Sequence, residues 1–354
     1  MRVLQINSER GWRGGERQTL LTALGLRERG HEVELLVRAG GALEARAQAE
    51  GLLTHAAQST VEFAVWLARQ ASRYDVLHVQ TANVLAWALL AKPMHRRPII
   101  FSRRTSFPVK GFSGFSRLKW TCTDVRVAIS EAAASAMREM GLSVHVIPSA
   151  VPAVVPNPAR VQEFLARENL FGCRLVGTAA ALSPEKNPVT LIRAAAQVCA
   201  QHPDVVFVHW GAEGAAADAA RQAIQDLGLG DRYRLLGFES GVEQLYPALA
   251  VFVMASRHEA LGSSVLDAMA QSVPVVATQA GGLMELLAEG RGLLSATDDA
   301  SGLAKHIGEV LSAPELGRAM AERSLQEVQN RYGVEAMVQA YEFLYRQAIA
   351  VTTK

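Results

Sequence analysis

The feature that most constrains the fold of this sequence is a repeated alternation of short apolar runs with longer helical segments. Five apolar runs in the first half are expected to be strands, at 3–6, 32–37, 76–79, 98–102 and 125–129. The segments between them, such as 15–28, show the 3.6-residue periodicity of helices. Strands that alternate with helices in this way predict a doubly wound parallel sheet.

A proline-rich stretch at 147–158, IPSAVPAVVPNP, interrupts this pattern and reads as a linker, because proline disfavours helix interiors and central strands. The second set of expected strands is 175–179, 205–210, 233–236, 251–254 and 273–277. From Ser301 onward the sequence reads as helices. The 354 residues therefore predict an α/β protein with domains at 1–158 and 159–330, and a helical segment at 331–354 that packs back on the first domain.

Composition excludes several classes of protein. Hydrophobic residues make up 49% of the chain, which excludes a disordered or collagen-like protein. No apolar run approaches the roughly 18 residues of a membrane span, and the first nine residues lack the apolar core of a secretion signal, so a cytoplasmic protein is expected. The three cysteines are widely spaced, and no cluster has metal-ligand spacing, so neither a disulfide framework nor a metal site is expected.

The net charge of +2 hides an asymmetry between the two halves. Residues 1–158 hold 20 lysines and arginines against 12 acids, and the remainder holds 16 against 22. Segment 92–126 carries nine cations and one anion, Asp124, with five aromatic residues among them: Phe101, Phe107, Phe112, Phe115 and Trp120. This segment suits an anionic inner-membrane surface, and a plain solvated basic surface remains the alternative. Nucleic acid is not expected, because no recognition-helix pattern is present.

Two adjacent glycines, Gly14 and Gly15, open the first expected helix. Without a Cβ, they let backbone N–H groups approach an anion at the positive end of the helix. Their spacing matches neither the dinucleotide-binding nor the Walker pattern, so an ordinary strand-to-helix turn is the alternative.

The most specific motif runs from an expected strand into a helix in the second half. Glu259 precedes the turn and Asp267 lies inside the helix. The turn between them offers the backbone amides of Leu261, Gly262, Ser263 and Ser264. Amides at a helix start bind phosphate and carboxylates accept hydrogen bonds from hydroxyls, so the motif suits a nucleotide-sugar diphosphate. As isolated charges, the two acids could equally be a helix-start acid and a surface residue.

With Pro274-Val275-Val276 and the Gly281-Gly282 motif that follow it, this segment resembles the signature of glycosyltransferase family 4, two acids separated by seven residues. The resemblance extends upstream, where 181–187 is similar to the family's phosphate-binding lysine loop. It implies the GT-B fold, with two Rossmann-like doubly wound parallel-sheet domains, an active site in the cleft between them and a C-terminal helical tail that crosses back. It also implies retaining, metal-independent transfer of a hexosyl group from a nucleotide sugar, without a cofactor. The implied acceptor is a glycan or glycolipid, in lipopolysaccharide or exopolysaccharide assembly.

The resemblance assigns roles to individual residues. Lys186 is expected to contact the diphosphate, Glu259 the donor sugar or its anomeric carbon, and Asp267 the ribose hydroxyls. The amides of Gly262, Ser263 and Ser264 are expected to meet the sugar and phosphates, and Gly14 and Gly15 the donor phosphate. Phe238 lies where the family holds the base, although a core aromatic would also fit this position.

The sequence departs from the family pattern at several positions. Asp267 stands where glutamate is usual, and Ala181 replaces an arginine before the lysine loop. Arg104 lies near the place of a histidine that faces the anomeric centre in many members; an arginine cannot act as a base but can bind a phosphate. His78 is either a buried strand-end histidine or an acceptor-site residue. A catalytically inactive nucleotide-binding subunit and a nucleotide-sugar epimerase or hydrolase remain as alternatives.

Overall fold

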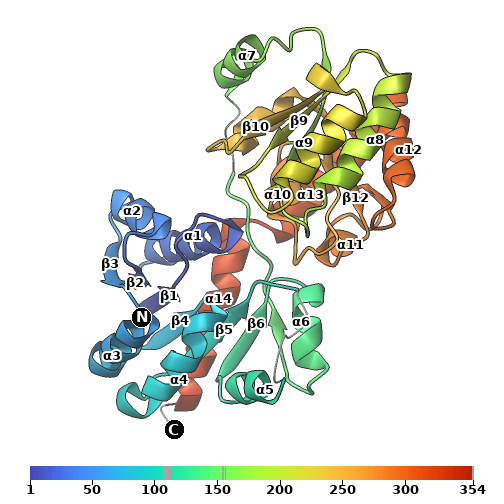
Figure 1. The fold of residues 1–354 in the computed structure, drawn as a ribbon. Helices are drawn as coiled ribbons and strands as arrows, with labels where there is room; N and C mark the ends of the chain where they lie inside the picture. Colours follow the sequence, from blue (N-terminus) through green and yellow to red (C-terminus); the bar gives the residue numbers. More distant parts are fainter. Residues whose placement is uncertain (107–112, 154, 156, 353–354) are drawn as a thin grey trace. The chain divides into compact units, whose positions relative to one another are not determined.

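The structure is a computed structural model that describes residues 1–106, 113–153, 155 and 157–352. It divides the chain into two compact units (Figure 1): Met1–Pro152 with Tyr332–Lys354, and Ala153–Arg331. The first division therefore lies six residues before the expected domain boundary at 158. Residues 157 and 158 belong to the second unit, because Asn157 caps a helix there by accepting a hydrogen bond from the N–H of Arg160 at 3.1 Å.

The first unit is built on a seven-stranded parallel sheet with the order β3-β2-β1-β4-β5-β6-β7. Its strands are β1 (Arg2–Asn7), β2 (Glu32–Arg38), β3 (Leu53–Ala57), β4 (Val76–Val79), β5 (Ile99–Arg103), β6 (Val125–Ala128) and β7 (His145–Val146). Its helices are α1 (Gly14–Glu28), α2 (Ala42–Ala49), α3 (Thr60–Gln70), α4 (Ala82–His95), α5 (Ser113–Thr121), α6 (Glu131–Arg138) and α14 (Val334–Thr352). The strand order reverses between β1 and β4, and loops at such a point form the usual ligand crevice of this kind of sheet.

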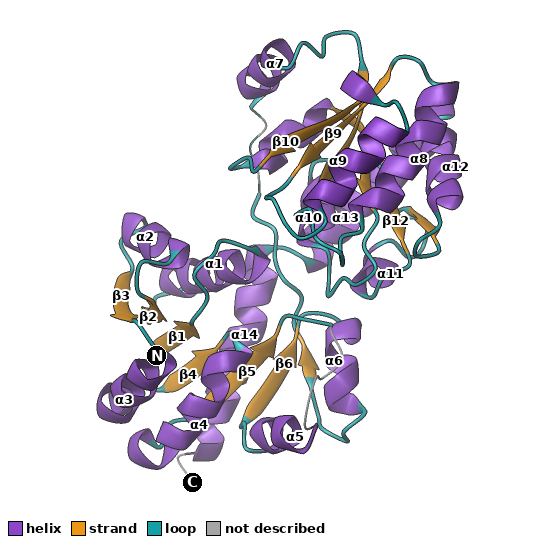
Figure 2. Cartoon of the chain, viewed as in Figure 1, coloured by secondary structure: helices purple, strands orange, loops and turns teal. Residues whose placement is uncertain are grey.

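Helices cover both faces of this sheet (Figure 2). Alternate residues of the strands pack on α1, α2 and α14 on one face, and on α3, α4 and neighbouring helices on the other. The C-terminal helix α14 contributes Val338, Tyr341 and Tyr345 to the first of these cores. It lies so close to α1 that a Cβ on Gly25 would be 2.6 Å from the Val338 side chain. The last helix is therefore an integral layer of the first unit.

The second unit contains a six-stranded parallel sheet with the order β10-β9-β8-β11-β12-β13. Its strands are β8 (Arg174–Ala179), β9 (Val205–Trp210), β10 (Tyr233–Gly237), β11 (Leu249–Met254), β12 (Val275–Thr278) and β13 (Leu293–Ser295). Its α-helices are α7 (Pro158–Arg167), α8 (Pro188–Gln201), α9 (Ala217–Asp226), α10 (Ser263–Ala270), α11 (Gly282–Leu286), α12 (Ala300–Ser312) and α13 (Pro314–Arg331). Here the strand order reverses between β8 and β11, which places the loops after these two strands side by side.

No helix in the described part of the chain is both long and apolar enough to span a bilayer.

Candidate functional site

Lys186 and Glu259 meet at the reversal point of the second sheet. Lys186 lies in the loop from β8 to α8, and Glu259 lies in the loop from β11 to α10. Lys186 Nζ donates to Glu259 Oε2 in an ion pair whose side chains are 25% and 13% exposed. The two residues that the family resemblance assigns to a diphosphate and to a sugar are therefore in direct contact. A partly buried charge pair of this kind can be opened by a ligand that offers an anion to the lysine and hydroxyls to the carboxylate.

The Glu259 loop is held by backbone and hydroxyl contacts. The N–H of Gly282 donates to the Glu259 carbonyl at 3.0 Å, and a Cβ at Gly282 would lie 2.3 Å from the Ala260 carbonyl oxygen. Thr278 Oγ1 donates to the Ser256 carbonyl at 2.5 Å, and Ser256 Oγ lies 3.5 Å from Glu259 Oε2. Glycine at 282 is thus required for the loop to pass, which accounts for the second glycine of the Gly281-Gly282 motif.

Arg257 and Asp298 tie the two loops together, and sequence reasoning missed this role. The Arg257 N–H donates to the Glu185 carbonyl at 2.8 Å, and its guanidinium pairs with Asp298 at 2.6 Å. Asp298 also accepts from Asn187 Nδ2 at 2.9 Å, and Asn187 has a left-handed backbone with φ of 52°. Arg257 was visible inside the motif, whereas nothing in the sequence marked Asp298 as its partner.

A buried histidine supports the start of the lysine loop. His209 of β9 lies 2.9 Å from the Ala180 carbonyl through Nε2 and 2.9 Å from the Tyr233 hydroxyl through Nδ1. A carbonyl only accepts, so Nε2 carries the proton and Nδ1 accepts from Tyr233. Burial lowers the pKa of His209 to about 4, so the ring is neutral at neutral pH.

The turn into α10 places backbone amides at a helix start. Gly262 is the N-cap with φ of 99°, and a Cβ there would lie 2.6 Å from Leu283 Cδ2. Leu261 is buried, whereas Ser263 and Ser264 form the first turn of the helix and are partly exposed. Asp267 lies one turn further and is only 6% exposed. The helix start therefore has anion-binding geometry, with the acid behind it rather than on the surface.

Phe238 lies at the carboxyl end of β10, directly after Gly237 with φ of 72°. Its side chain is 63% exposed, which excludes the core-aromatic alternative. The role in holding a base stays a prediction.

In the first unit, Gly14 and Gly15 begin α1 as expected from the sequence. Gly15 faces Arg104, because a Cβ on the glycine would lie 3.6 Å from Arg104 Cδ. The N–H of Arg13 donates to Glu16 Oε2 at 2.9 Å, and burial raises the pKa of Glu16. The glycine turn, at the end of β1, is thus fixed beside a cation.

Arg104 follows β5 and is anchored by neutral groups. It donates through Nε and Nη2 to Gln80 Oε1 at 3.0 and 2.6 Å, and Nη1 lies 3.3 Å from Ser149 Oγ. Burial lowers the pKa of Arg104, although a guanidinium stays protonated at neutral pH. The residue is therefore a fixed positive charge, suited to an anion and not to proton abstraction.

His78 is fully buried, on the sheet face that α14 covers. Nδ1 lies 2.6 Å from the Tyr345 hydroxyl, and Nε2 lies 2.7 Å from Ser102 Oγ. Burial, with the Arg104 charge nearby, lowers the pKa of His78 well below its usual range. The structure favours the buried alternative over an acceptor-site role, because both ring nitrogens already face hydroxyl groups of the protein.

The basic segment is only partly a solvent face. The Trp120 ring is 6% exposed and lies under Arg103 at 5.3 Å, so this aromatic residue of the segment is not available to a membrane surface. Phe115 is 54% exposed on α5 and Arg117 is also exposed, whereas Lys92 pairs with Asp124 at 2.7 Å. Phe107, Lys110 and Phe112 lie outside the described residues. Alternation of cations and aromatics did not reveal which aromatic faced inward.

Over the residues that the structure describes, no group of three histidine, cysteine, aspartate or glutamate side chains lies together in a way that could hold a metal ion.

Comparisons with known proteins match both halves of the chain to sugar-transfer families. The family model described as Glycosyl transferases group 1 matches residues 165–327, and the model described as Glycosyltransferase Family 4 matches residues 12–155. The lipopolysaccharide core biosynthesis mannosyltransferase LpcC of Rhizobium leguminosarum bv. viciae is 27% identical over 80% of this chain and 82% of its own length. The lipopolysaccharide core biosynthesis glycosyltransferase LpsE of Rhizobium meliloti is 33% identical over 43% of this chain and 44% of its own.

Solved structures share the fold over almost the whole chain. Anabaena Alr3699/HepE, in complex with UDP and glucose, superposes with a TM-score of 0.89 at 22% identity and covers 98% of this chain and 100% of its own. Sucrose-phosphate synthase from Thermosynechococcus elongatus gives a TM-score of 0.82 at 19% identity, over 99% of each chain.

Proposed function

The chain belongs to the group 1, family 4 glycosyltransferases and has their GT-B fold, and we propose that it transfers a hexosyl group with retention from a nucleotide sugar to a glycan or glycolipid acceptor. The observation that carries this proposal is the contact of Lys186 with Glu259 beside the start of α10. A cation, a carboxylate and helix-start amides are the groups that a nucleotide diphosphate and its sugar need.

Three similar proteins support the choice of donor and pathway. Alr3699/HepE is described in complex with UDP and glucose, so a UDP-sugar is the first donor to test. LpcC and LpsE are named for lipopolysaccharide core biosynthesis, and LpcC for mannosyl transfer. We therefore place the reaction in the assembly of lipopolysaccharide or a related exopolysaccharide, with a mannosyl donor as the second to test.

In the proposed reaction, negative charge builds on the departing diphosphate while the anomeric carbon becomes positive. Lys186 and the amides of Ser263 and Ser264 stabilise the diphosphate, a role in which positive charge matters more than a base. When Lys186 pairs with the diphosphate instead of Glu259, the Glu259 carboxylate is free to accept hydrogen bonds from the sugar hydroxyls. Asp267 is assigned to the ribose through its small exposed surface.

The first unit supplies a second positive site in this proposal. Arg104 and the amides of Gly14 and Gly15 bind donor phosphate or an acidic acceptor. The bond from the anomeric carbon to the diphosphate oxygen breaks, and the bond to the acceptor oxygen forms on the same face. The acceptor proton passes to the leaving phosphate, so no protein base is required and no metal ion is needed for charge.

The acceptor side is proposed to dock on the anionic surface of the inner membrane. Exposed Phe115 and Arg117 on α5, with exposed Arg96 at the end of α4, support this part. Cations near such a surface each contribute about 1 kcal/mol of attraction.

The deciding experiment measures nucleoside diphosphate release from a panel of UDP-, GDP- and ADP-sugars, with and without acceptor oligosaccharide, in the presence of EDTA. Slow release without acceptor and faster release with it would support transfer, and NMR of the product anomeric proton would test retention. Absence of release from every donor would favour the inactive-subunit alternative. Formation of a donor epimer, or hydrolysis of the donor that the acceptor does not accelerate, would favour the epimerase or hydrolase alternative. Loss of activity in EDTA and its return with Mn²⁺ would refute metal independence.

A further inference from the structure

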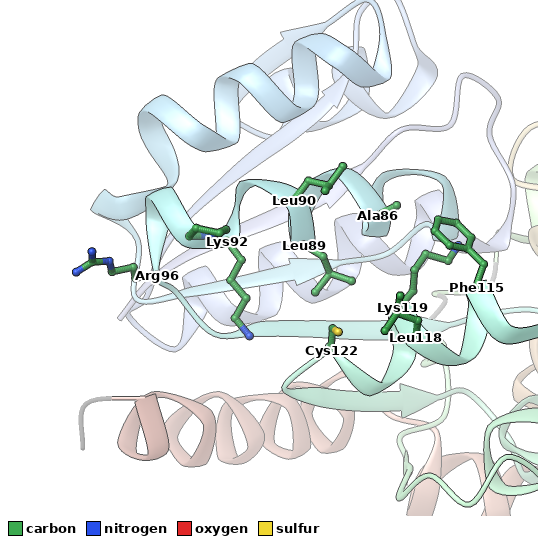
Figure 3. A pocket seen from close by; sticks show the side chains of 10 residues that line it. Ala86, Leu89, Leu90, Lys92, Arg96, Phe115, Leu118, Lys119 and Cys122 are labelled. Atoms are coloured by element: carbon green, nitrogen blue, oxygen red, sulfur yellow. The ribbon is translucent and has the colours of Figure 1, made fainter.

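An apolar pocket of about 790 Å³ lies between α4 and α5 in the first unit (Figure 3). Leu89 of α4 and Cys122, just after α5, face each other across it, and Phe115 and Leu118 of α5 form part of its wall. Its volume falls within the range of ligand pockets, roughly 300–1,000 Å³. Gly14, Gly15 and Arg104 do not line the pocket, so it is separate from the proposed donor and phosphate contacts.

Large apolar side chains stay exposed around this pocket. Leu90, Phe115 and Leu118 are 67%, 54% and 59% exposed. All three line one pocket between two adjacent helices, and an exposed apolar cluster marks an interaction site when polar groups border it. Isolated exposed apolar side chains need no explanation, but three around one hollow do.

Cations border the pocket at both ends. Lys92 and Arg96 lie at one end and Lys119 lies with Phe115 at the other, as Figure 3 shows. Lys92 is already paired with Asp124, whereas Arg96 is exposed at the left-handed C-cap of α4 and forms no ion pair with any residue that the structure describes. Lys119 Nζ lies 5.0 Å from the Phe115 ring centroid. Partial burial lowers the pKa of Lys119, and an anion bound beside it would favour the charged form of the amine.

We propose that the α4–α5 pocket binds the hydrocarbon chain of a phosphate-bearing membrane lipid, with the phosphate held at the rim by Arg96 and Lys119. Charge complementarity selects this occupant: the walls are apolar and the rim is positive. From Ala86 to Arg96, the C-cap of α4, the ten helical rises span about 15 Å, which is enough for an alkyl chain of medium length.

This inference deepens the proposed membrane docking and rests on it, but it makes a different claim. Electrostatic adsorption depends on surface charge and has no fixed stoichiometry. A pocket for one chain binds a single lipid molecule saturably, and it does so in the absence of a bilayer.

Cys122 provides a native reporter for occupancy, because it lines the pocket and is exposed. We would add dodecyl phosphate, as monomers below its critical micelle concentration, and follow alkylation of Cys122 by maleimide with peptide mass spectrometry. Alkylation is expected to slow at least tenfold at saturation, with one molecule bound per chain by calorimetry. Cys173, which lies in the second unit, is the internal control and should react at an unchanged rate. Equal protection by uncharged dodecyl maltoside would refute the phosphate at the rim, and protection by inorganic phosphate alone would refute the chain in the pocket.

Substitutions test the wall and the rim separately. Leu118→Glu should weaken dodecyl phosphate binding at least tenfold, whereas Leu53→Glu, at 58% exposure on β3, should not. Arg96→Gln with Lys119→Gln should weaken it similarly, and Arg193→Gln, at an exposed position of α8, should not. Unchanged binding in both test variants would overturn the proposal, as would a dimer in light scattering that Leu118→Glu dissociates, since a second copy would then be the occupant.

Donor hydrolysis gives a readout that separates the two proposals. All four variants lie outside the donor contacts and should release nucleoside diphosphate at the wild-type rate. Normal hydrolysis with no dodecyl phosphate binding would refute only the lipid pocket, and lipid binding without hydrolysis of any donor would refute only the transferase mechanism.

Discussion

The hydroxyl of Tyr345 lies 2.6 Å from Nδ1 of His78, although 267 residues separate them in the chain. The same hydroxyl accepts a hydrogen bond from Gln5 Nε2 at 3.1 Å, so one side chain of α14 contacts both β1 and β4. Gln80 extends the chain of contacts by donating to Gln5 Oε1 at 2.8 Å and accepting from Arg104. The position of Arg104 therefore depends on a helix at the far end of the sequence.

Tyr345→Phe is expected to destabilise the first unit, because it leaves buried His78 and Gln5 without their common partner. An unpaired buried polar group costs about 1–3 kcal/mol. Urea unfolding followed by circular dichroism measures the change. Phe343→Leu, at a 60% exposed position of the same helix, should stay near wild type. Equal stability of the two variants would show that the network contributes nothing.

Lys186→Ala is expected to reduce turnover at least about 100-fold, because it removes the cation that stabilises the departing diphosphate. Release of nucleoside diphosphate at saturating donor is the measurement, with circular dichroism to check folding. Lys305→Ala provides the control, since Lys305 is 72% exposed on α12. Near wild-type turnover in Lys186→Ala would refute the assignment of this site.

Gly262→Ala is expected to weaken nucleotide binding and lower the thermal midpoint. The backbone φ of 99° strains any residue with a Cβ by about 1–3 kcal/mol, and that Cβ would collide with Leu283. Calorimetry with UDP and a thermal scan measure the two effects. In Gly308→Ala within α12, the new Cβ makes only an ordinary contact with His202 Nε2 at 3.7 Å, so this variant should be neutral or slightly stabilising. Normal UDP affinity with a lowered midpoint would mean that the α10 start does not bind the nucleotide.

Acid is expected to destabilise the second unit through His209. The folded pKa of about 4 lies below the ordinary value of 6.5, so the unfolded chain binds a proton first as pH falls. The contribution of His209 to the free energy of unfolding is fully present above pH 6.5. It is lost between pH 6.5 and 4, by up to about 1.4 kcal/mol per pH unit. Urea titrations at intervals from pH 7.5 to 4.5 should show a shallower loss in His209→Gln. His145→Gln, on the exposed edge strand β7, should keep the wild-type slope.

Flotation with liposomes is expected to recover the protein with anionic vesicles and not with neutral ones. Recovery should fall as salt rises, because the Debye length shrinks from about 30 Å at 0.01 M to about 8 Å at physiological ionic strength. Arg96→Gln with Arg117→Gln should reduce recovery at low salt. Equal recovery on both lipids, or none on either, would support the alternative that segment 92–126 is a plain solvated surface.

The sequence predicted the central strands well and missed three others. Each expected strand coincides with an observed one, since parallel strands covered on both faces read as continuous apolar runs. The missed strands are β3, β7 and β13, all at edges of the two sheets. Leu53 at the start of β3 is 58% exposed, so an edge strand lacks the buried pattern that marks a central one.

The expected linker extends too far, because proline is common both in linkers and in the first turn of a helix. The proline-rich pattern predicts a linker that ends at Pro158, but Pro158 occupies the first turn of α7, where its missing N–H costs nothing. The side chain of Asn157 caps that helix, a signal present in the sequence and overlooked.

The candidate site was predictable only where local motifs reported it. Glu259 and Gly262 lie within one strand-to-helix motif, and the resemblance to a family supplied Lys186. Contact between Lys186 and Glu259 follows from the adjacency of β8 and β11, which no local pattern reveals. The partnership of Arg257 with Asp298 spans 41 residues and has no signature at all.

The hydrogen bond from the N–H of Val151 to the Tyr332 carbonyl, 2.8 Å long, joins the two places where the chain leaves the first unit and returns to it. The second unit is thus an insertion in the first. During synthesis the ribosome completes residues 153–331 before it delivers α14, so the second unit can fold while one face of the first sheet still lacks the part of its cover that α14 provides. The unit whose synthesis begins first finishes last, and in the interval its sheet is the part of the nascent chain most exposed to aggregation.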